Sequence, residues 1–191
     1  MAIKYTNKSR KRNRLKNYNY NNDGMYFITS CAQGRIEYFG KIKNEKMEYS
    51  KYGNIILKFW QEIPNHYKNV FLDEYIIMPN HIHGIVVIDS TVNLNSNKIA
   101  TKTVGTAHCA VPTVDNSKNY GLLSKIIKSF KEISLKTIRR DFNDYEFKWQ
   151  RSFHDHIIRD EKSLQKIRRY IYYNPAGWEM DRNNLKSLDE I

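Results

Sequence analysis

Two histidines, His81 and His83, stand two residues apart at the start of an apolar, β-branched run that continues to Ile88. Such a run is typical of a β-strand, in which residues i and i+2 point to the same face. Two imidazoles side by side on a rigid strand can supply half of a metal site. Taken alone, this spacing favours two ordinary strand histidines, so the interpretation depends on what else can reach them.

A second set of chemically capable residues lies on a predicted helix near the C-terminus. Asp160 is a typical N-cap, and Pro175 disfavours helical geometry at Asn174, so we expect a helix from Glu161 to about Tyr173. At about 100° per residue, the buried stripe of this helix consists of Leu164, Ile167 and Ile171. Tyr170 and Asn174, spaced i and i+4, are neighbours on one border of that stripe.

If that border lies over the histidine pair, the two sets form one constellation. The imidazoles of His81 and His83 and the amide oxygen of Asn174 could hold a divalent ion, and this mixture suits Mg²⁺ or Mn²⁺ with water completing the shell. The Tyr170 hydroxyl could then attack a phosphodiester, although a free phenol has a pKa near 10 and needs a nearby cation or base. The alternative is that Tyr170 is a helix-border aromatic whose hydroxyl lies in water.

The elements that must position these residues can be predicted from hydrophobic periodicity. Apolar residues at helical spacing predict one helix from Ser50 that Pro64 ends, and a second from Gly121 to Arg140. Residues 89–120 are rich in Asn, Thr and Ser without a clear period, which predicts a long loop. We expect strands or extended segments at 25–31, 38–42, 70–72, 75–78, 81–88, 147–153 and 156–159.

The amino-acid composition indicates the class of binding partner more than it indicates the fold. The 191 residues carry a formal net charge of +12, which favours nucleic acid over an anionic membrane as the partner. No apolar stretch reaches the roughly 18 residues of a membrane span, and the basic N-terminus lacks the apolar core of a signal peptide. Two cysteines without a CxxC pair predict reduced thiols and a cytoplasmic protein.

The basic residues are concentrated in three places. Residues 1–24 form a basic arm that could order on DNA or could remain a solvated tail. The helix at 121–140 has a basic side, and the C-terminal helix carries two arginines beside Tyr170. The cations that we expect to contact DNA are Arg10, Lys11, Arg12, Arg14, Lys125, Lys128, Arg151, Arg159, Arg168 and Arg169.

Three stretches together resemble a known family. Met78-Pro79-Asn80-His81-Ile82-His83, Trp149-Gln150-Arg151-Ser152-Phe153-His154-Asp155-His156 and Tyr170-Ile171-Tyr172-Tyr173-Asn174-Pro175 are similar to motifs of the REP-associated tyrosine transposases. These belong to the HUH single-strand DNA nucleases and transposases with a single tyrosine. The likeness covers about residues 25–180. The chain differs from these relatives by the insertion at 89–120 and by Ala176-Gly177-Trp178 after the Asn-Pro pair.

The resemblance implies more than the spacing does. It implies an α+β, ferredoxin-like fold, with helices packed on an antiparallel sheet, as a single domain over residues 25–180 followed by a tail at 181–191. It implies that His81 and His83 bind the metal, that Asn174 sits where related enzymes place a third ligand, and that Tyr170 forms a 5′-phosphotyrosine link. His156 matches a family histidine that could bind DNA or support the site.

The expected function is therefore cleavage and strand transfer of single-stranded DNA at hairpin-bearing, REP-like elements, by a bacterial protein bound to the nucleoid. A replication-initiator nuclease, a nucleic-acid-binding relative without activity, and a metal-dependent hydrolase that uses water remain as alternatives. A homodimer that exchanges a helix between partners is compatible with the resemblance, as is a monomer, and no coiled-coil pattern decides between them.

Overall fold

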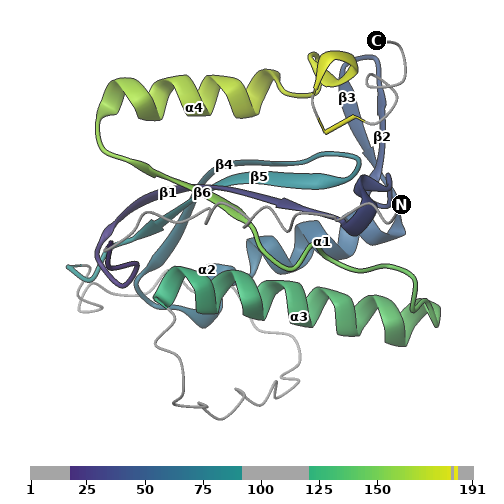
Figure 1. The fold of residues 1–191 in the computed structure, drawn as a ribbon, viewed down its shortest axis with the longest axis horizontal. Helices are drawn as coiled ribbons and strands as arrows, with labels where there is room; N and C mark the ends of the chain where they lie inside the picture. The colour runs from purple at the N-terminus through teal and green to yellow at the C-terminus, as the bar shows by residue number, and fades with distance from the viewer. Residues whose placement is uncertain (1–17, 92–120, 182, 185–191) are drawn as a thin grey trace, which may run out of the picture.

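The structure is a computed structural model that describes residues 18–91, 121–181 and 183–184 (Figure 1). Most of the predicted basic arm, including Arg10, Lys11, Arg12 and Arg14, lies outside the described residues, as does most of the predicted loop at 89–120. The last residues of the arm do have described positions, and Tyr20 is buried against Tyr26 and Gly121. Within the described residues, no helix is both long enough and apolar enough to cross a membrane.

The elements follow the predicted order. They are β1 (Gly24–Cys31), η1 (Gln33–Arg35), β2 (Gly40–Lys43), β3 (Lys46–Tyr49), α1 (Lys51–Gln61), α2 (Ile63–His66), β4 (Val70–Ile77), β5 (His81–Ile88), α3 (Leu122–Phe142), β6 (His154–Ile158), α4 (Glu161–Tyr173) and η2 (Trp178–Met180). However, β3, α2, η1 and η2 were not predicted, and the segments predicted at 70–72 and 75–78 form one strand. The prediction that Pro64 ends a helix was wrong: α1 ends at Gln61, and Pro64 lies in the first turn of α2, where its missing N–H costs nothing. β6 begins two residues before the predicted strand at 156–159.

The main sheet has the strand order β4-β5-β1-β6, and every neighbouring pair is antiparallel. The helices α1 and α3 cover one face of the sheet, and α4 lies across the other (Figure 1). The succession β1-α1-β4-β5-α3-β6 is the β-α-β-β-α-β arrangement of the ferredoxin-like fold, so the predicted fold class is confirmed. β2 and β3 form a separate hairpin inserted between β1 and α1.

The two faces of the sheet carry separate cores because side chains alternate along β5. Ile82 and Val86 belong to the large core under α1 and α3, together with Trp60. Ile85 belongs to a smaller core under α4, with Ile158, Leu164 and Ile171. His81 and His83 share the face of Ile85, so the alternation predicted from the sequence places both imidazoles on the side of α4.

Gly84 allows the strand of the histidines to pack closely against α1. A Cβ atom at this position would lie 2.5 Å from Cζ2 of the buried Trp60 and 3.0 Å from Cβ of Tyr75. Both neighbours are held in the large core, so neither can yield without disturbing the packing.

Gly84→Ala should therefore lower the free energy of unfolding by about 1–3 kcal/mol, the usual cost of overpacking a core. Chemical denaturation followed by tryptophan fluorescence measures this difference. Gly177→Ala is the matched control, because the nearest atom to its Cβ would be 3.8 Å away. Equal unfolding midpoints for the two variants would contradict the described packing of β5 on α1.

Lys131 of α3 is a buried cation that fastens the segment before β6 to the helix. Its Nζ donates hydrogen bonds to the carbonyl oxygens of Gln150 and Ser152, at 3.0 and 3.1 Å. The same segment is tied to the end of β1, because the Gln150 amide donates to the Cys31 carbonyl at 2.9 Å. Burial lowers the pKa of Lys131 to about 8, because it disfavours the charged form.

This lowered pKa predicts a stability that depends on pH. Between about pH 8 and pH 10.5 the unfolded chain keeps a proton on Lys131 that the folded protein has lost, so stability rises with pH across that window. The free energy of unfolding of the wild-type protein, minus that of Lys131→Met, should increase by about 1–2 kcal/mol between about pH 7 and pH 9.5. Denaturation curves at each pH measure it, with the exposed Lys128→Met as control. A constant difference between the wild-type protein and Lys131→Met would refute the prediction.

Candidate active site

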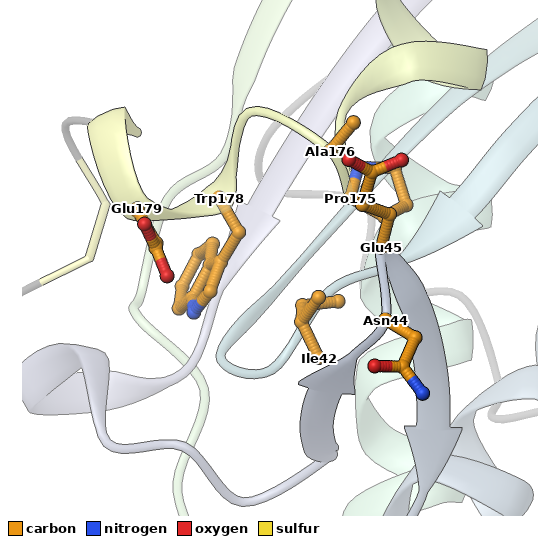
Figure 2. A pocket seen from close by; sticks show the side chains of 7 residues that line it. All are labelled: Ile42, Asn44, Glu45, Pro175, Ala176, Trp178 and Glu179. Atoms are coloured by element: carbon orange, nitrogen blue, oxygen red, sulfur yellow. The ribbon is translucent and has the colours of Figure 1, made fainter.

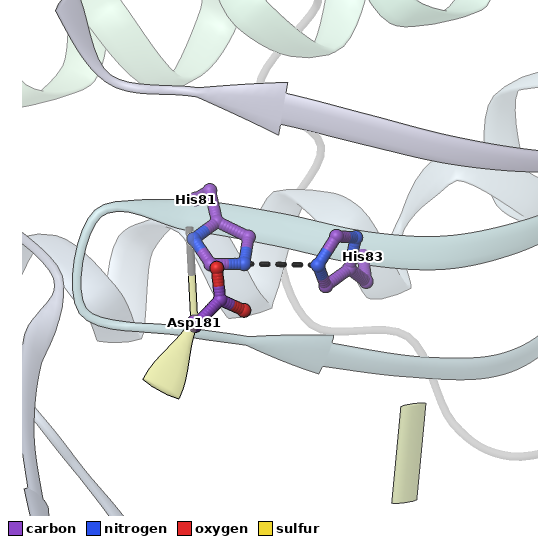
Figure 3. Close-up of side chains that lie close together, drawn as sticks. All are labelled: His81, His83 and Asp181. Atoms are coloured by element: carbon purple, nitrogen blue, oxygen red, sulfur yellow. Dashed lines mark hydrogen bonds between the residues drawn. The ribbon is translucent and has the colours of Figure 1, made fainter. Parts of the chain in front are cut away.

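The two histidines face one another on β5, as Figure 3 shows. Their Nε2 atoms lie 3.0 Å apart, and the side chains are almost completely buried, at 0% and 1% exposed. Each Nδ1 atom has its own partner: Asn80 Oδ1 lies 2.8 Å from that of His81, and Thr29 Oγ1 lies 2.9 Å from that of His83. Thr29 is the residue opposite His83 in the pairing of β1 with β5. The strand and its neighbour thus aim both Nε2 atoms at one point.

The orientation of Asn80 determines which nitrogen of His81 carries the proton. Its Nδ2 donates to the carbonyl oxygens of Arg35 and Asn183, at 2.7 and 2.8 Å, so Oδ1 must be the atom that faces His81. An amide oxygen only accepts, and Nδ1 of His81 is therefore the donor. The neutral imidazole then presents a lone pair at Nε2, which is how a metal-binding histidine is held by its hydrogen-bond partner.

Asp181 completes a group that could bind a metal ion. One ligand atom from each of His81, His83 and Asp181 lies within 4.8 Å of the others (Figure 3). Sequence analysis missed this residue, because it comes after the last predicted helix in a segment without periodicity. Trp178 lies between the end of α4 and Asp181, and its ring centroid is 6.0 Å from that of His81.

Tyr170 reaches this group from α4 within the same chain. Its hydroxyl lies 3.1 Å from Nε2 of His83, and its ring stands edge-on to Phe27 of β1, with centroids 6.0 Å apart. Asp160 caps the start of α4 by accepting a hydrogen bond from the Ser163 amide, as predicted. The side chain of Tyr170 is 45% exposed. Tyr170 therefore contacts the buried histidine pair and is also accessible from the protein surface.

Asn174 lies at the C-cap of α4, one turn beyond Tyr170. It is 6% exposed, and its Oδ1 is buried without a hydrogen-bond partner among the described residues. A buried acceptor without a donor is costly in a protein interior, and a cation would satisfy it. The position of Asn174 as a metal ligand nevertheless stays a prediction, and Asp181 is a second candidate for the same role.

A pocket is lined in part by Trp178, the residue whose ring lies near His81. It has a volume of about 230 Å³ and separates the tip of the β2–β3 hairpin from the turn that follows α4 (Figure 2). Its lining residues are Ile42, Asn44, Glu45, Pro175, Ala176, Trp178 and Glu179. Neither the histidines nor Tyr170 line it, and the carboxylates of Glu45 and Glu179 disfavour an anionic ligand in it.

The structure separates the cations that were predicted to contact DNA. Lys125 and Lys128 lie on α3, which packs on the opposite face of the sheet from α4 (Figure 1). Arg151, Arg159 and Arg169 are exposed, but only Arg169 lies on α4. Arg168 does not project freely, since its guanidinium binds the carboxylate of Asp73. The structure therefore brings together Tyr170, His81 and His83, and leaves the helix α3 elsewhere.

His156 lies on the same face of the sheet as the histidine pair. It is opposite Phe27 in the pairing of β1 with β6, and the ring of Phe27 stacks on His83 with centroids 5.3 Å apart. Its side chain is exposed, and it is not part of the described group that could bind a metal. A role for His156 beside the DNA stays a prediction.

Comparison with known sequences places the chain among related proteins. No family model matches it. It is 38% identical over 173 residues to an uncharacterised protein of Haemophilus influenzae, which covers 88% of this chain and 89% of the relative. It is also 25% identical over 170 residues to a "Putative REP-associated tyrosine transposase" of the same organism, over 85% of this chain and 77% of the relative.

Two solved structures are similar at lower levels. One is a REP-associated tyrosine transposase bound to a REP hairpin, with a TM-score of 0.49 and 15% identity over 85% of this chain and 72% of that one. The other is a transposase-like protein of Deinococcus radiodurans, with a TM-score of 0.44 and 12% identity over 83% and 95% of the two chains.

The sequence relatives and the geometry of the site point in the same direction. The likeness to the second Haemophilus protein extends over most of both chains. The histidine pair and the late tyrosine, which the sequence separates widely, converge in one place, with the tyrosine hydroxyl 3.1 Å from a histidine nitrogen. Over most of its length the chain is therefore similar to a REP-associated tyrosine transposase.

Proposed function

We propose that this protein is a transposase that cleaves and rejoins single-stranded DNA through a covalent link to Tyr170, with a metal ion held by the neighbouring histidines. One observation carries the proposal: the Tyr170 hydroxyl and the Nε2 atoms of His81 and His83 lie within a few hydrogen-bond lengths of one another, in a single chain. A nucleophile next to a metal-binding group is an arrangement that suits phosphodiester transfer.

The residues present fit a divalent metal ion. Two imidazole nitrogens and the carboxylate of Asp181 form a mixed donor set that suits Mg²⁺ or Mn²⁺, and Asn174 offers a buried amide oxygen close in sequence to Tyr170. The two Nε2 atoms are 3.0 Å apart, and the lone pair on that of His81 can accept either a proton from His83 or a cation. The metal, when bound, would polarise a non-bridging oxygen of the phosphodiester and stabilise the charge that develops in transfer.

The chain itself supplies the nucleophile and its position. The Tyr170 oxygen loses its proton and bonds to phosphorus, while the bond from phosphorus to the 3′ oxygen breaks and that oxygen leaves as a hydroxyl after taking up a proton. The downstream strand is then joined by its 5′ phosphate to the tyrosine. Attack by another 3′ hydroxyl reverses these bond changes and joins two strands, so no external energy source is required. Phe27 limits the freedom of the tyrosine ring.

The substrate class follows from charge and exposure. The net charge of +12 favours a polyanion, and α4 presents Tyr172 and Tyr173 at 71% and 61% exposed beside Arg169. Exposed aromatics next to cations suit unstacked bases and the backbone of a single strand. The related transposase that was solved with a REP hairpin supports hairpin-bearing DNA as the first substrate to try.

The decisive experiment incubates the protein with hairpin oligonucleotides in Mn²⁺ or Mg²⁺ and resolves the products on a denaturing gel. A label at the 3′ end of the DNA should migrate with the protein, and a label at the 5′ end should appear on a released fragment. Cleavage with neither label on the protein would indicate a water-dependent hydrolase. Binding without cleavage on every oligonucleotide would indicate a protein that only binds nucleic acid.

A further inference from the structure

The helix that carries Tyr170 is joined to the sheet by one long-range ion pair. Nε of Arg168 donates to Oδ1 of Asp73 at 2.8 Å, and Nη2 donates to Oδ2 at 2.5 Å. The ion pairs Lys43–Glu48, Lys128–Glu132 and Arg140–Asp141 join close neighbours in sequence, whereas this one joins α4 to β4 across the fold. The pairing is bidentate, which fixes direction as well as distance.

A bulge in β4 aims Asp73 at α4. Leu72 pairs with Val86 and Tyr75 pairs with Gly84, so two residues of β4, Asp73 and Glu74, occupy the space opposite one residue of β5. Bulges of this kind redirect a side chain and release an amide from the ladder. Here the Glu74 amide donates to Oδ1 of Asp73 at 2.8 Å, so the bulge itself holds the carboxylate in place. The Arg168 guanidinium lowers the pKa of Asp73.

The pair and the nucleophile lie on opposite flanks of the same helix. Arg168 and Tyr170 are about 160° apart around α4, and the buried Ile171 lies between them on the face toward the sheet. One flank rests on β4 through Asp73, and the other rests on β5 through the contact of Tyr170 with His83. Contacts on both flanks determine the rotation of the helix about its own axis.

Small rotations of α4 would move the nucleophile by chemically important distances. A side-chain tip lies about 6 Å from the helix axis, so a rotation of about 20° moves it by about 2 Å. A misplacement of about 1 Å at the reacting atoms can reduce a rate about 100-fold. The isoleucine and leucine contacts under α4 have no preferred direction, so they restrict the rotation of the helix less than a bidentate ion pair does.

We infer that Asp73 and Arg168 are positioning residues that set the rotation of α4, and thereby bring the Tyr170 hydroxyl to the histidine pair. The expected effect on the reaction rate rests on the proposed function. The expected effect on the position of Tyr170 rests on geometry alone. It also reassigns Arg168, which the sequence presented as a cation for DNA. Neither residue contacts the group that could bind a metal, so their effect on the reaction passes through the helix.

The kinetic test separates positioning from DNA contact. Asp73→Asn removes an anion, so it cannot weaken DNA binding by loss of charge. We expect the rate of adduct formation at saturating hairpin DNA to fall about 10- to 100-fold, with an unchanged dissociation constant. Arg168→Lys should show a smaller loss of rate, and Arg168→Met should add little further when combined with Asp73→Asn. Arg169→Met, on the exposed side of the helix, is the control and should affect binding alone.

A spectroscopic test does not require activity. Tyrosine labelled with fluorine at position 170 reports its surroundings through the ¹⁹F resonance of the free protein. Asp73→Asn and Arg168→Lys should shift or broaden that resonance, and Arg169→Met should leave it unchanged. An unmoved resonance together with an unchanged saturated rate would overturn the inference, as would a double variant whose loss of rate equals the product of the single losses. If the wild-type protein forms no adduct with any DNA, the proposed function fails, and the resonance still decides the role of the pair.

Discussion

Tyr170→Phe abolishes the covalent protein–DNA adduct and leaves DNA affinity unchanged: this is the expected result with the largest effect. The substitution removes one oxygen, and that oxygen is the proposed nucleophile, 3.1 Å from Nε2 of His83. The phenylalanine ring keeps the edge contact with Phe27, so the fold of α4 should persist. Loss of a nucleophile reduces turnover by about 10⁴-fold or more, which places adduct formation below detection.

The matched control is Tyr172→Phe. Tyr172 lies on the same helix and is 71% exposed, so removing its hydroxyl tests the loss of a phenol without touching the histidine pair. Adduct formation is measured on denaturing gels with 3′-labelled hairpin DNA, and affinity is measured by fluorescence anisotropy. Cleavage that persists in Tyr170→Phe while the adduct disappears would transfer the nucleophilic role to water. An adduct that persists would transfer it to another side chain.

His81→Gln should weaken Mn²⁺ binding at least about 100-fold, because it removes one of two imidazole ligands that the strand holds in place. The fraction of free Mn²⁺, measured by electron paramagnetic resonance in the absence of DNA, gives the dissociation constant directly. His156→Gln is the control, since His156 is exposed on the same face of the sheet but outside the group that could bind a metal. Equal Mn²⁺ affinities for the two variants would refute the assignment of the site.

The same measurement decides which oxygen donor completes the site. Asp181→Asn should weaken Mn²⁺ binding more than Asn174→Ala if the carboxylate is the ligand, because it removes a full negative charge. The opposite order would favour Asn174, the ligand that the family resemblance suggested. Unchanged affinity in both variants would leave the two histidines as the only protein ligands.

Short-range sequence patterns correctly predicted α4 and β5, the helix and the strand that carry the candidate site. Asp160 and Pro175 bracket α4, and the observed helix, Glu161–Tyr173, has the predicted bounds. Strand alternation placed His81 and His83 on one face, which the structure confirms. Both predictions depend only on residues within a few positions of each other, where backbone geometry determines which side chains are neighbours.

Long-range partners could not be predicted in the same way. Asp181 lies near the histidines because the chain turns after α4, and no periodic pattern in the sequence predicts that turn. Asp73 faces α4 because β4 has a bulge, which has no periodic pattern either. Asn80 stands next to His81 in the sequence, but its role depends on the distant carbonyl of Asn183. From the sequence, Lys125 and Lys128 could not be distinguished from the cations of α4 as contacts for DNA. The topology shows that the sheet lies between α3, which carries these two lysines, and α4.

The two halves of the site belong to parts of the fold with different resistance to local opening. β5 lies between β4 and β1, so exposing the backbone of His81 and His83 to solvent requires breaking two strand pairings. The helix α4 covers a core of only a few buried residues, so we expect it to separate from the sheet more easily than the helices on the other face. We therefore expect the proposed metal-binding half of the site to open only with the whole sheet, and the proposed nucleophile to belong to a unit that opens at a lower free energy.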